Sequence, residues 1–542
     1  MKKIIGSTAG LKATQIKQLE NLYLYRTDPE YLISLEQTQE MVAISHDIGR
    51  QVGLLIDRAG KTIYVIAGDA HRIVIPDTTD YRALPGQLKG LRCIHTHLKD
   101  DPLSQDDLTD LALLRLDFMA AVTVTDAGLP GKIYRGHILP QEEGLPYEVM
   151  PPIFSDGLDM DCSAMIKALE SELSRLNALY SADKGEEKAL LIHVTTDAPK
   201  EAKASLEELK ELCRSSGVQV IDTAIQRRRK IDPKFVVGKG KLAELTIQAI
   251  QKHATMLVFD QELGAAQIRS ITDFVEMKVL DRTQIILDIF AKHARSREGK
   301  LQVELAQMQY LLPRLITKNT AMSRLTGGIG GRGPGETKLE LNRRRVRERI
   351  AKLNKDLSKI RKQRSQQRAR RNRKGVPVIS IVGYTNAGKS TLLNSLTQSN
   401  ITAENKLFAT LDPSSRRLRF PRDVEVIITD TVGFIQDLPD ELMDAFQATL
   451  EELEQADILL HVVDVSNPRY NQQIQSVEKI LKKLSLEHLP VIFVFNKQDR
   501  IEINQFDNPW LLNQGILVSA TRRETLKPLV SRLESMVYEF FT

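Results

Sequence analysis

Cysteines and long apolar runs are both scarce in this chain of 542 residues, and each scarcity excludes a class of protein. The three cysteines, Cys93, Cys162 and Cys213, lie far apart and lack the spacing of metal-binding thiolates. Neither a disulfide framework nor a cysteine zinc cluster is therefore expected. No stretch reaches the ~18 consecutive apolar residues of a membrane-spanning helix, and no long apolar segment follows the basic N-terminus. We expect a cytoplasmic protein without stable membrane insertion.

Residues 1–182 give the weakest pattern in the chain. Residues 52–57 and 62–67 predict two strands joined by a turn, and residues 106–116 have the pattern of a helix. We therefore expect an N-terminal extension of mixed α+β architecture.

His95, His97 and Asp107 form a candidate metal site within this extension. Two histidines at positions i and i+2 of a strand project to the same side, and with a downstream aspartate they can ligate zinc. With Ser104 added, the spacing resembles the signature of JAMM-type metalloproteases, one residue short. That signature also requires a glutamate general base, and Gln51 stands where we expect it. An active zinc peptidase is thus one alternative, and an inactive structural or regulatory domain is the favoured one.

Strand-like and helical segments alternate between residues 188 and 298. The strand-like segments are 189–194, 218–221 and 255–259, and the helical segments are 200–213, 241–253 and 265–277. Such alternation is typical of a small parallel α/β domain. One glycine turn, from Gly238 to Gly240, enters a helix. It is either a structural turn, which we favour, or a second nucleotide site.

Residues 299–374 predict two helices separated by a glycine-rich loop at residues 327–335, which no helix can traverse. Apolar residues in the second helix are spaced 4, 3, 4 and 3 apart, as in a coiled-coil seam. They are Val346, Ile350, Leu353, Leu357 and Ile360, and the facing residues of the first helix are Leu301, Leu305, Met308, Leu312 and Leu315. We expect an antiparallel helical hairpin with a glycine-rich tip.

Positive charge is concentrated in the second helix of this hairpin. Residues 341–374 contain 16 lysines and arginines against two acidic residues, a local net charge of +14, whereas the whole chain carries +6. Solubility does not require such an excess, so we expect this helix to bind a polyanion such as RNA. The alternative is that the charges only keep an exposed coiled coil in solution.

The remaining residues, 375–542, alternate strands and helices as in a doubly wound, mainly parallel sheet. Its first apolar run, 376–382, leads into a loop that has a glycine near each end and opens a helix. The loop residues are Gly383, Tyr384, Thr385, Asn386, Ala387, Gly388, Lys389 and Ser390. In this strand–loop–helix context the backbone N–H groups can surround phosphate oxygens. Lys389 would then reach the β- and γ-phosphates, and the hydroxyl of Ser390 would ligate Mg²⁺.

Four further motifs follow, three of them after predicted strands, at the edge of the sheet where ligands bind. They are Phe408, Ala409, Thr410, Leu411 and Asp412; Asp430, Thr431, Val432 and Gly433; Asn496, Lys497, Gln498 and Asp499; and Ser519, Ala520 and Thr521. Thr410 is the expected switch residue, which closes on Mg²⁺ only when the γ-phosphate is present. Asp430 would hold Mg²⁺ through water, and the N–H of Gly433 would sense the γ-phosphate.

The last two motifs predict recognition of guanine. The carboxylate of Asp499 can accept hydrogen bonds from the N1–H and the exocyclic amine, a pattern that adenine does not offer. Asn496 would address the edge of the ring, and the stem of Lys497 would cover its face. The segment 519–521 would supply a backbone N–H for the guanine carbonyl. The five motifs together predict a GTPase.

These motifs, together with residues 299–307 and 330–337, resemble the HflX family of translational GTPases, and the resemblance covers the chain from about residue 188 onward. It implies a P-loop GTPase domain that binds GTP and GDP with Mg²⁺ and associates with the large (50S) ribosomal subunit through its ribosomal RNA. It also implies that the protein splits or rescues stalled or idle ribosomes. A ribosome-assembly or RNA-remodelling factor is the alternative, and a GTPase-regulated metalloprotease is a weaker one. We expect a monomer.

Phe434 departs from Ras-type chemistry, as is usual in the family that the chain resembles. Ras-type enzymes place a glutamine here to orient the attacking water. Phenylalanine cannot hydrogen-bond that water, so another group or a partner must complete the site.

Overall fold

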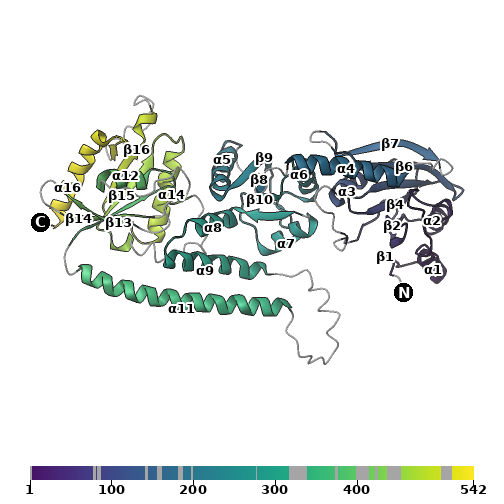
Figure 1. Ribbon diagram of the computed structural model, residues 1–542, viewed down its shortest axis with the longest axis horizontal. Helices are drawn as coiled ribbons and strands as arrows, with labels where there is room; N and C mark the ends of the chain where they lie inside the picture. Colours follow the sequence, from purple (N-terminus) through teal and green to yellow (C-terminus); the bar gives the residue numbers. More distant parts are fainter. Residues whose placement is uncertain are drawn as a thin grey trace. The chain divides into compact units, whose positions relative to one another are not determined.

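The computed structural model describes residues 3–76, 78, 81, 87–140, 144–154, 161–180, 187–196, 199–275, 277–315, 338–372, 376–397, 414–420, 425–431, 433–435, 453–501 and 515–541. The chain divides into two compact units. One comprises Met1–Leu190, Ile221–Leu257 and Ile271–Lys278, and the other Leu191–Val220, Val258–Ser270 and Val279–Thr542. Within the described ranges the strands form sheets of seven, four and six strands (Figure 1). No helix there is long and apolar enough to cross a membrane.

The N-terminal sheet has the order β1-β3-β2-β4-β5-β6-β7. Its strands are β1 (Ile5–Gly6), β2 (Val52–Asp57), β3 (Thr62–Ala67), β4 (Leu91–His97), β5 (Phe118–Val124), β6 (Pro130–Ile138) and β7 (Tyr147–Phe154). Its helices are α1 (Ala13–Asn21), α2 (Leu35–Ile48), α3 (Gln105–Leu114) and α4 (Cys162–Tyr180). The two strands and the helix predicted in this region are confirmed. The central strand β4 pairs antiparallel with β2 and parallel with β5.

Strands β4 and β5 at the centre of this sheet are buried on both faces. Successive residues of a strand point to opposite sides, so they pack in two different clusters. Ile94 packs in one cluster with residues of α1, α2 and α4. Its neighbour Cys93 packs in another with Leu108 and Leu111 of α3. The helix α3 therefore covers one face of the sheet, with its first turn close to the end of β4.

The second sheet has the order β11-β10-β8-β9. It consists of β8 (Glu187–Thr195), β9 (Val218–Arg227), β10 (Met256–Phe259) and β11 (Lys278–Asp281), which alternate with α5 (Pro199–Ser216), α6 (Lys239–Gln251), α7 (Ala265–Phe274) and α8 (Arg282–His293). The predicted alternation of strands and helices is confirmed here, and β11 and α8 extend it.

The glycine turn at Gly238 is packed against an arginine. Gly238 has a φ of +88°, and a Cβ atom there would lie 2.4 Å from Nη1 of Arg228. That same nitrogen donates a hydrogen bond to the carbonyl of Val237. These contacts favour the structural-turn interpretation of this loop.

The helices α9 (Arg297–Arg314) and α11 (Lys338–Asn372) lie side by side, as the heptad spacing predicts (Figure 1). Leu305 packs against Leu353 and Leu357, and Leu301, Met308 and Ile350 flank this contact. Each fully buried leucine stabilises the pair by about 1.5–3 kcal/mol. The predicted glycine-rich tip lies outside the described residues.

The third sheet has the order β13-β14-β12-β15-β16-β17. Its strands are β12 (Val378–Gly383), β13 (Ser414–Arg419), β14 (Glu425–Asp430), β15 (Ile458–Asp464), β16 (Val491–Asn496) and β17 (Gly515–Leu517). Only the edge strand β13 runs antiparallel to its neighbour, and the other described pairs are parallel. The predicted mainly parallel sheet is therefore confirmed, whereas β13 was not predicted.

Helices cover both faces of this sheet, as a doubly wound fold requires. Residues of α12 (Lys389–Thr397) and α16 (Lys527–Phe541) pack with Ile381 on one face. Residues of α14 (Tyr470–Lys483) pack with Val382 on the other. The carboxyl ends of the parallel strands consequently meet at one edge, and the polar motifs lie there.

Candidate nucleotide-binding site

The loop between β12 and α12 can be built only with glycine at two positions. Gly383 has a φ of +149°, and a Cβ atom there would lie 2.2 Å from the carbonyl oxygen of Val462. Gly388 has a φ of +91°, and its Cβ atom would lie 2.3 Å from Nδ2 of Asn496. Both the backbone angle and the close neighbours exclude other residues. The predicted phosphate-binding loop therefore has the tight geometry that its glycines imply.

Lys389 is folded back across this loop. Its Nζ donates hydrogen bonds to the carbonyl oxygens of Tyr384, at 2.7 Å, and Gly383, at 3.1 Å. Burial lowers the pKa of this ammonium to about 8, although the nearby Asp430 opposes the shift. A phosphate would supply negative charge that such a desolvated ammonium lacks, so Lys389 is suited to bind one.

Ser390 and Asp430 meet beside this lysine. The Ser390 hydroxyl donates to Oδ2 of Asp430 at 2.6 Å, and Asp430 is fully buried at the end of β14. Hydroxyl and carboxylate oxygens are the hard ligands that Mg²⁺ prefers. The two side chains therefore fit a magnesium site, Ser390 by direct ligation and Asp430 by direct or water-mediated contact.

The segment after Asp430 pairs with the phosphate-binding loop. The N–H of Thr385 donates to the carbonyl of Phe434 at 2.7 Å, and the N–H of Phe434 donates to the carbonyl of Gly383 at 3.1 Å. A Cβ atom on Gly433 would lie 2.8 Å from Cγ2 of Thr385 and 3.0 Å from Nζ of Lys389. Gly433 is thus held beside the phosphate-binding loop, and its contact with a terminal phosphate stays a prediction.

The side chain of Phe434 belongs to the core. It is 3 % exposed and packs with Val382, Leu459 and Val477 between the sheet and α14. Its ring therefore anchors the segment that carries Gly433, and it offers no polar group to a hydrolytic water.

Asn496 joins two segments of the site through its side-chain amide. Its Nδ2 donates to the carbonyl of Ala387 at 2.8 Å, and its Oδ1 accepts from the N–H of Ala520 at 2.9 Å. The side chain is 2 % exposed. Asn496 therefore braces the phosphate-binding loop against the segment 519–521. Because an amide nitrogen carries two N–H donors, the contact of Asn496 to the base edge stays a prediction.

The residues around Asn496 set the remaining positions of the base-recognition motif. Lys497 has a φ of +66°, and its Nζ forms an ion pair with Asp464 at 2.7 Å. Asp499 is exposed, and a hydrogen bond from Ser519 lowers the pKa of its carboxyl. An exposed, ionised carboxylate is the acceptor that guanine recognition requires.

The segment 519–521 uses two of its N–H groups internally. The N–H of Ser519 donates to Oγ1 of Thr525, and that of Ala520 donates to Asn496. The N–H of Thr521 is therefore the candidate donor to a guanine carbonyl.

Some predicted residues lie outside the described part of the chain. They are Phe408, Ala409, Thr410, Leu411, Asp412 and Val432. The assignment of Thr410 as switch residue and second magnesium ligand stays a prediction.

One neighbour of the site was missed by sequence reasoning. The hydroxyl of Tyr384 donates to Oε1 of Glu208 on α5 at 2.7 Å. Nη2 of Arg282 lies 2.9 Å from the same oxygen of Glu208, and Nη1 of Arg282 lies 3.0 Å from Oδ1 of Asp260. Tyr384 therefore connects the phosphate-binding loop to a buried ionic network. No local sequence signal marks a contact between residues 176 positions apart.

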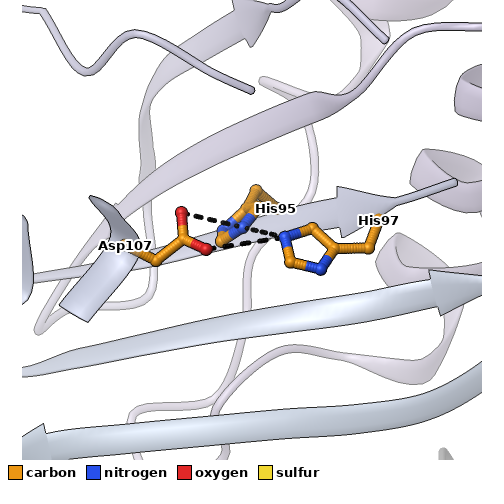
Figure 2. A group of neighbouring side chains, drawn as sticks. All are labelled: His95, His97 and Asp107. Atoms are coloured by element: carbon orange, nitrogen blue, oxygen red, sulfur yellow. Dashed lines mark hydrogen bonds and ion pairs between the residues drawn. The ribbon is translucent and has the colours of Figure 1, made fainter. Parts of the chain in front are cut away.

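His95, His97 and Asp107, by contrast, are brought together as predicted. Figure 2 shows their side chains converging from the end of β4 and the first turn of α3, with dashed contacts among them. They lie in the N-terminal sheet domain and share no residue with the nucleotide site.

Three family models match this chain. Residues 203–291 match the family described as GTP-binding GTPase N-terminal, residues 293–371 its Middle Region, and residues 378–497 the family described as 50S ribosome-binding GTPase. Proteins called GTPase HflX are similar to this chain over most of their own length.

The GTPase HflX of Caldanaerobacter subterraneus subsp. tengcongensis is 46 % identical over 354 residues, which are 65 % of this chain and 81 % of the relative. That of Lacrimispora saccharolytica is 45 % identical over 352 residues, 65 % of this chain and 83 % of the relative. That of Escherichia coli is 43 % identical over 320 residues, which are 59 % of this chain and 75 % of the relative. These identities confirm the resemblance: the chain belongs to the HflX family and is a GTPase with a P-loop α/β fold.

Proposed function

We propose that this GTPase acts on the large ribosomal subunit and uses GTP to split or rescue stalled or idle ribosomes. The match of residues 378–497 to a family described as 50S ribosome-binding supports association with that subunit. Ribosomal RNA is the partner chemistry that the basic helix α11 would recognise.

The observation that carries this proposal is the separation of apolar and basic residues on α11. Leu353 and Leu357 are buried against α9, whereas Arg344, Arg345 and Arg347 are exposed. Cations on the outer side of a rigid helix can displace counterions from several phosphates at once. Lysine–glutamate pairs would keep an exposed helix in solution equally well, yet residues 341–374 contain only two acidic residues.

We assign the nucleotide contacts to the motifs described above. Gly383 to Ser390 would surround the phosphates, Ser390 and Thr410 would ligate Mg²⁺, and Asp499 would select guanine. That the protein is a monomer and that it is cytoplasmic both stay predictions.

The arm is tested by removing its charge without disturbing its seam. Exchanging Arg344, Arg345 and Arg347 for Gln keeps helix propensity near its original value. If each arginine neutralises one phosphate, the slope of log affinity against log salt should become shallower by roughly 2–3. Affinity for large subunits should fall while GTP binding is unchanged, as measured by sedimentation at several salt concentrations.

A matched control removes three charges elsewhere. Lys479, Lys482 and Lys483 are exposed on α14, and their exchange for Gln should leave the salt dependence unaltered. Equal losses in both variants would assign the effect to net charge. Parental affinity and slope in the arginine variant would refute the arm as the RNA contact.

A ribosome-assembly factor could use the same arm without separating subunits. The two functions are distinguished by whether intact ribosomes separate into subunits when the protein and GTP are added.

A further inference from the structure

Three ligand-type atoms converge between strand β4 and helix α3. His95 Nε2 lies 2.9 Å from His97 Nε2 and 3.4 Å from Oδ1 of Asp107, and His97 Nε2 lies 3.6 Å from Oδ2 of Asp107. Figure 2 shows the carboxylate facing both rings. The histidines reach the same side because they are two residues apart on one strand. In a tetrahedral zinc site, bonds of ~2.0–2.2 Å separate neighbouring ligand atoms by about 3.3–3.5 Å. Two of the three observed separations are close to that range.

The second nitrogen of His97 fixes which atom faces the cluster. Its Nδ1 lies 2.9 Å from the carbonyl oxygen of Asp101. A carbonyl only accepts, so Nδ1 carries the proton, and in the neutral ring Nε2 has a free lone pair. A backbone carbonyl behind a histidine is a recurrent support of metal ligands.

His95 directs its polar contacts to the same point. Its side chain is fully buried, and within the described residues its Nδ1 has no hydrogen-bond partner. Nε2, which faces His97 and Asp107, is therefore where this buried ring makes its polar contacts. Burying two imidazoles and a carboxylate is costly unless something compensates their loss of water.

Asp107 also has a simpler role, which accounts for only part of the geometry. As the third residue of α3 it closes a capping box, with Oδ2 accepting from the N–H and the hydroxyl of Ser104 at 2.8 and 2.7 Å. A cap needs no imidazole. Oδ1 is directed at His95, and the bonds from Ser104 hold the carboxylate in place, as bonds to metal-ligating carboxylates do.

We propose that His95, His97 and Asp107 bind a divalent transition metal of the zinc class through the two Nε2 atoms and the carboxylate. Two imidazoles and one carboxylate are a recurrent zinc donor set. The side chains are 0 %, 9 % and 14 % exposed, respectively. Solvent therefore reaches the cluster from the side of Asp107, where water can complete the coordination. The site is separate in chain and chemistry from the magnesium site of the GTPase.

Gln51 stands where a metalloprotease would have its glutamate general base, and a glutamine cannot take that role. Gly53 of β2 pairs with His95, and Gln51 stands two residues before Gly53, directly ahead of that strand. An amide cannot take a proton from a metal-bound water. The metal instead fastens the first turn of α3 to the end of β4.

The test is a zinc titration of the full-length protein, stripped of metal and held in excess Mg²⁺, against a chromophoric chelator. The parent should bind one equivalent of Zn²⁺, and its melting temperature should rise with the free zinc concentration. Asp107→Asn keeps an acceptor for the helix cap but lacks the anionic ligand, so zinc affinity should fall at least tenfold. His97→Gln should fall likewise. Ser104→Ala, which removes the support of the carboxylate together with the cap of α3, should lose roughly 10-fold.

The control is His71→Asn, which replaces an exposed histidine of the same domain. It should bind zinc like the parent, and circular dichroism with GTP binding should confirm that each variant folds. The Co²⁺-loaded parent should show the strong visible absorption of a four-coordinate site, a measurement that needs no variant. The proposal is overturned if the parent does not bind Zn²⁺ with saturation, if folded Asp107→Asn binds it as tightly, or if bound Co²⁺ is six-coordinate.

Discussion

Asn496 is the residue whose removal should most clearly separate the structural account from a motif-based one. A motif alone makes it a contact to the base, so its loss should affect guanine nucleotides only. In the structure it joins Ala387 to Ala520 through two hydrogen bonds of 2.8 and 2.9 Å. Asn496→Ala leaves a buried carbonyl and a buried N–H without partners, and each unmade bond costs about 1–3 kcal/mol. We expect about 2–4 kcal/mol of lost stability, because water can enter the space vacated by the amide.

Thermal unfolding measures this loss directly. For a domain of roughly 150–250 residues, 1 kcal/mol corresponds to about 2–4 °C, so the melting temperature of the GTPase domain should fall by roughly 5–15 °C. GTP and xanthosine triphosphate should both bind more weakly, since the phosphate-binding loop loses its brace. A variant that melts like the parent and loses only guanine affinity would refute the bracing role.

The remaining predictions concern specificity, protonation and turnover. Asp499→Asn should weaken GTP binding by ~1–3 kcal/mol through mismatched polar groups and strengthen binding of xanthosine triphosphate; unchanged GTP affinity would refute the base assignment. Because burial lowers the pKa of Lys389 to about 8, the unfolded chain binds more protons above that pH, so ligand-free stability should increase between pH 8 and 10. Bound phosphates favour the protonated form of Lys389, so GTP binding near pH 9 should be accompanied by proton uptake. Calorimetry in buffers of different ionisation enthalpy should detect this uptake in the parent and none in Lys389→Met. Since Phe434 offers no group to orient water, the isolated protein should hydrolyse GTP slowly and ribosomes should accelerate it; basal turnover of ~10 s⁻¹ that ribosomes leave unchanged would contradict this.

The nucleotide site was predictable because its motifs are local. A strand, a glycine loop and a helix adjoin in the chain, so Gly383 and Lys389 could be placed without knowing the fold. Asn496 was assigned to the correct edge of the sheet, but its contacts within the protein were not predicted. Its partners lie 109 and 24 positions away, and only the folded backbone brings them within reach.

Two further differences have physical reasons. The edge strand β13 contains Arg416, Arg417 and Arg419, so it lacks the alternation of apolar and polar residues by which a strand is predicted. An edge strand tolerates such charged residues because one of its sides has no neighbouring strand. Strand β5 of the N-terminal sheet escaped prediction because it is buried on both faces. Continuous apolar runs of that kind do not distinguish strand from helix.

The most direct test of the central claim is sedimentation of intact 70S ribosomes incubated with the full-length protein and GTP, a non-hydrolysable analogue, or GDP. The account predicts that GTP and the analogue bring the protein onto the large subunit and separate the particles into 50S and 30S subunits, and that GDP does neither. Intact 70S particles in all three nucleotide states, with the protein bound only to free large subunits, would indicate an assembly factor. Failure to bind any ribosomal particle in any nucleotide state would contradict the account.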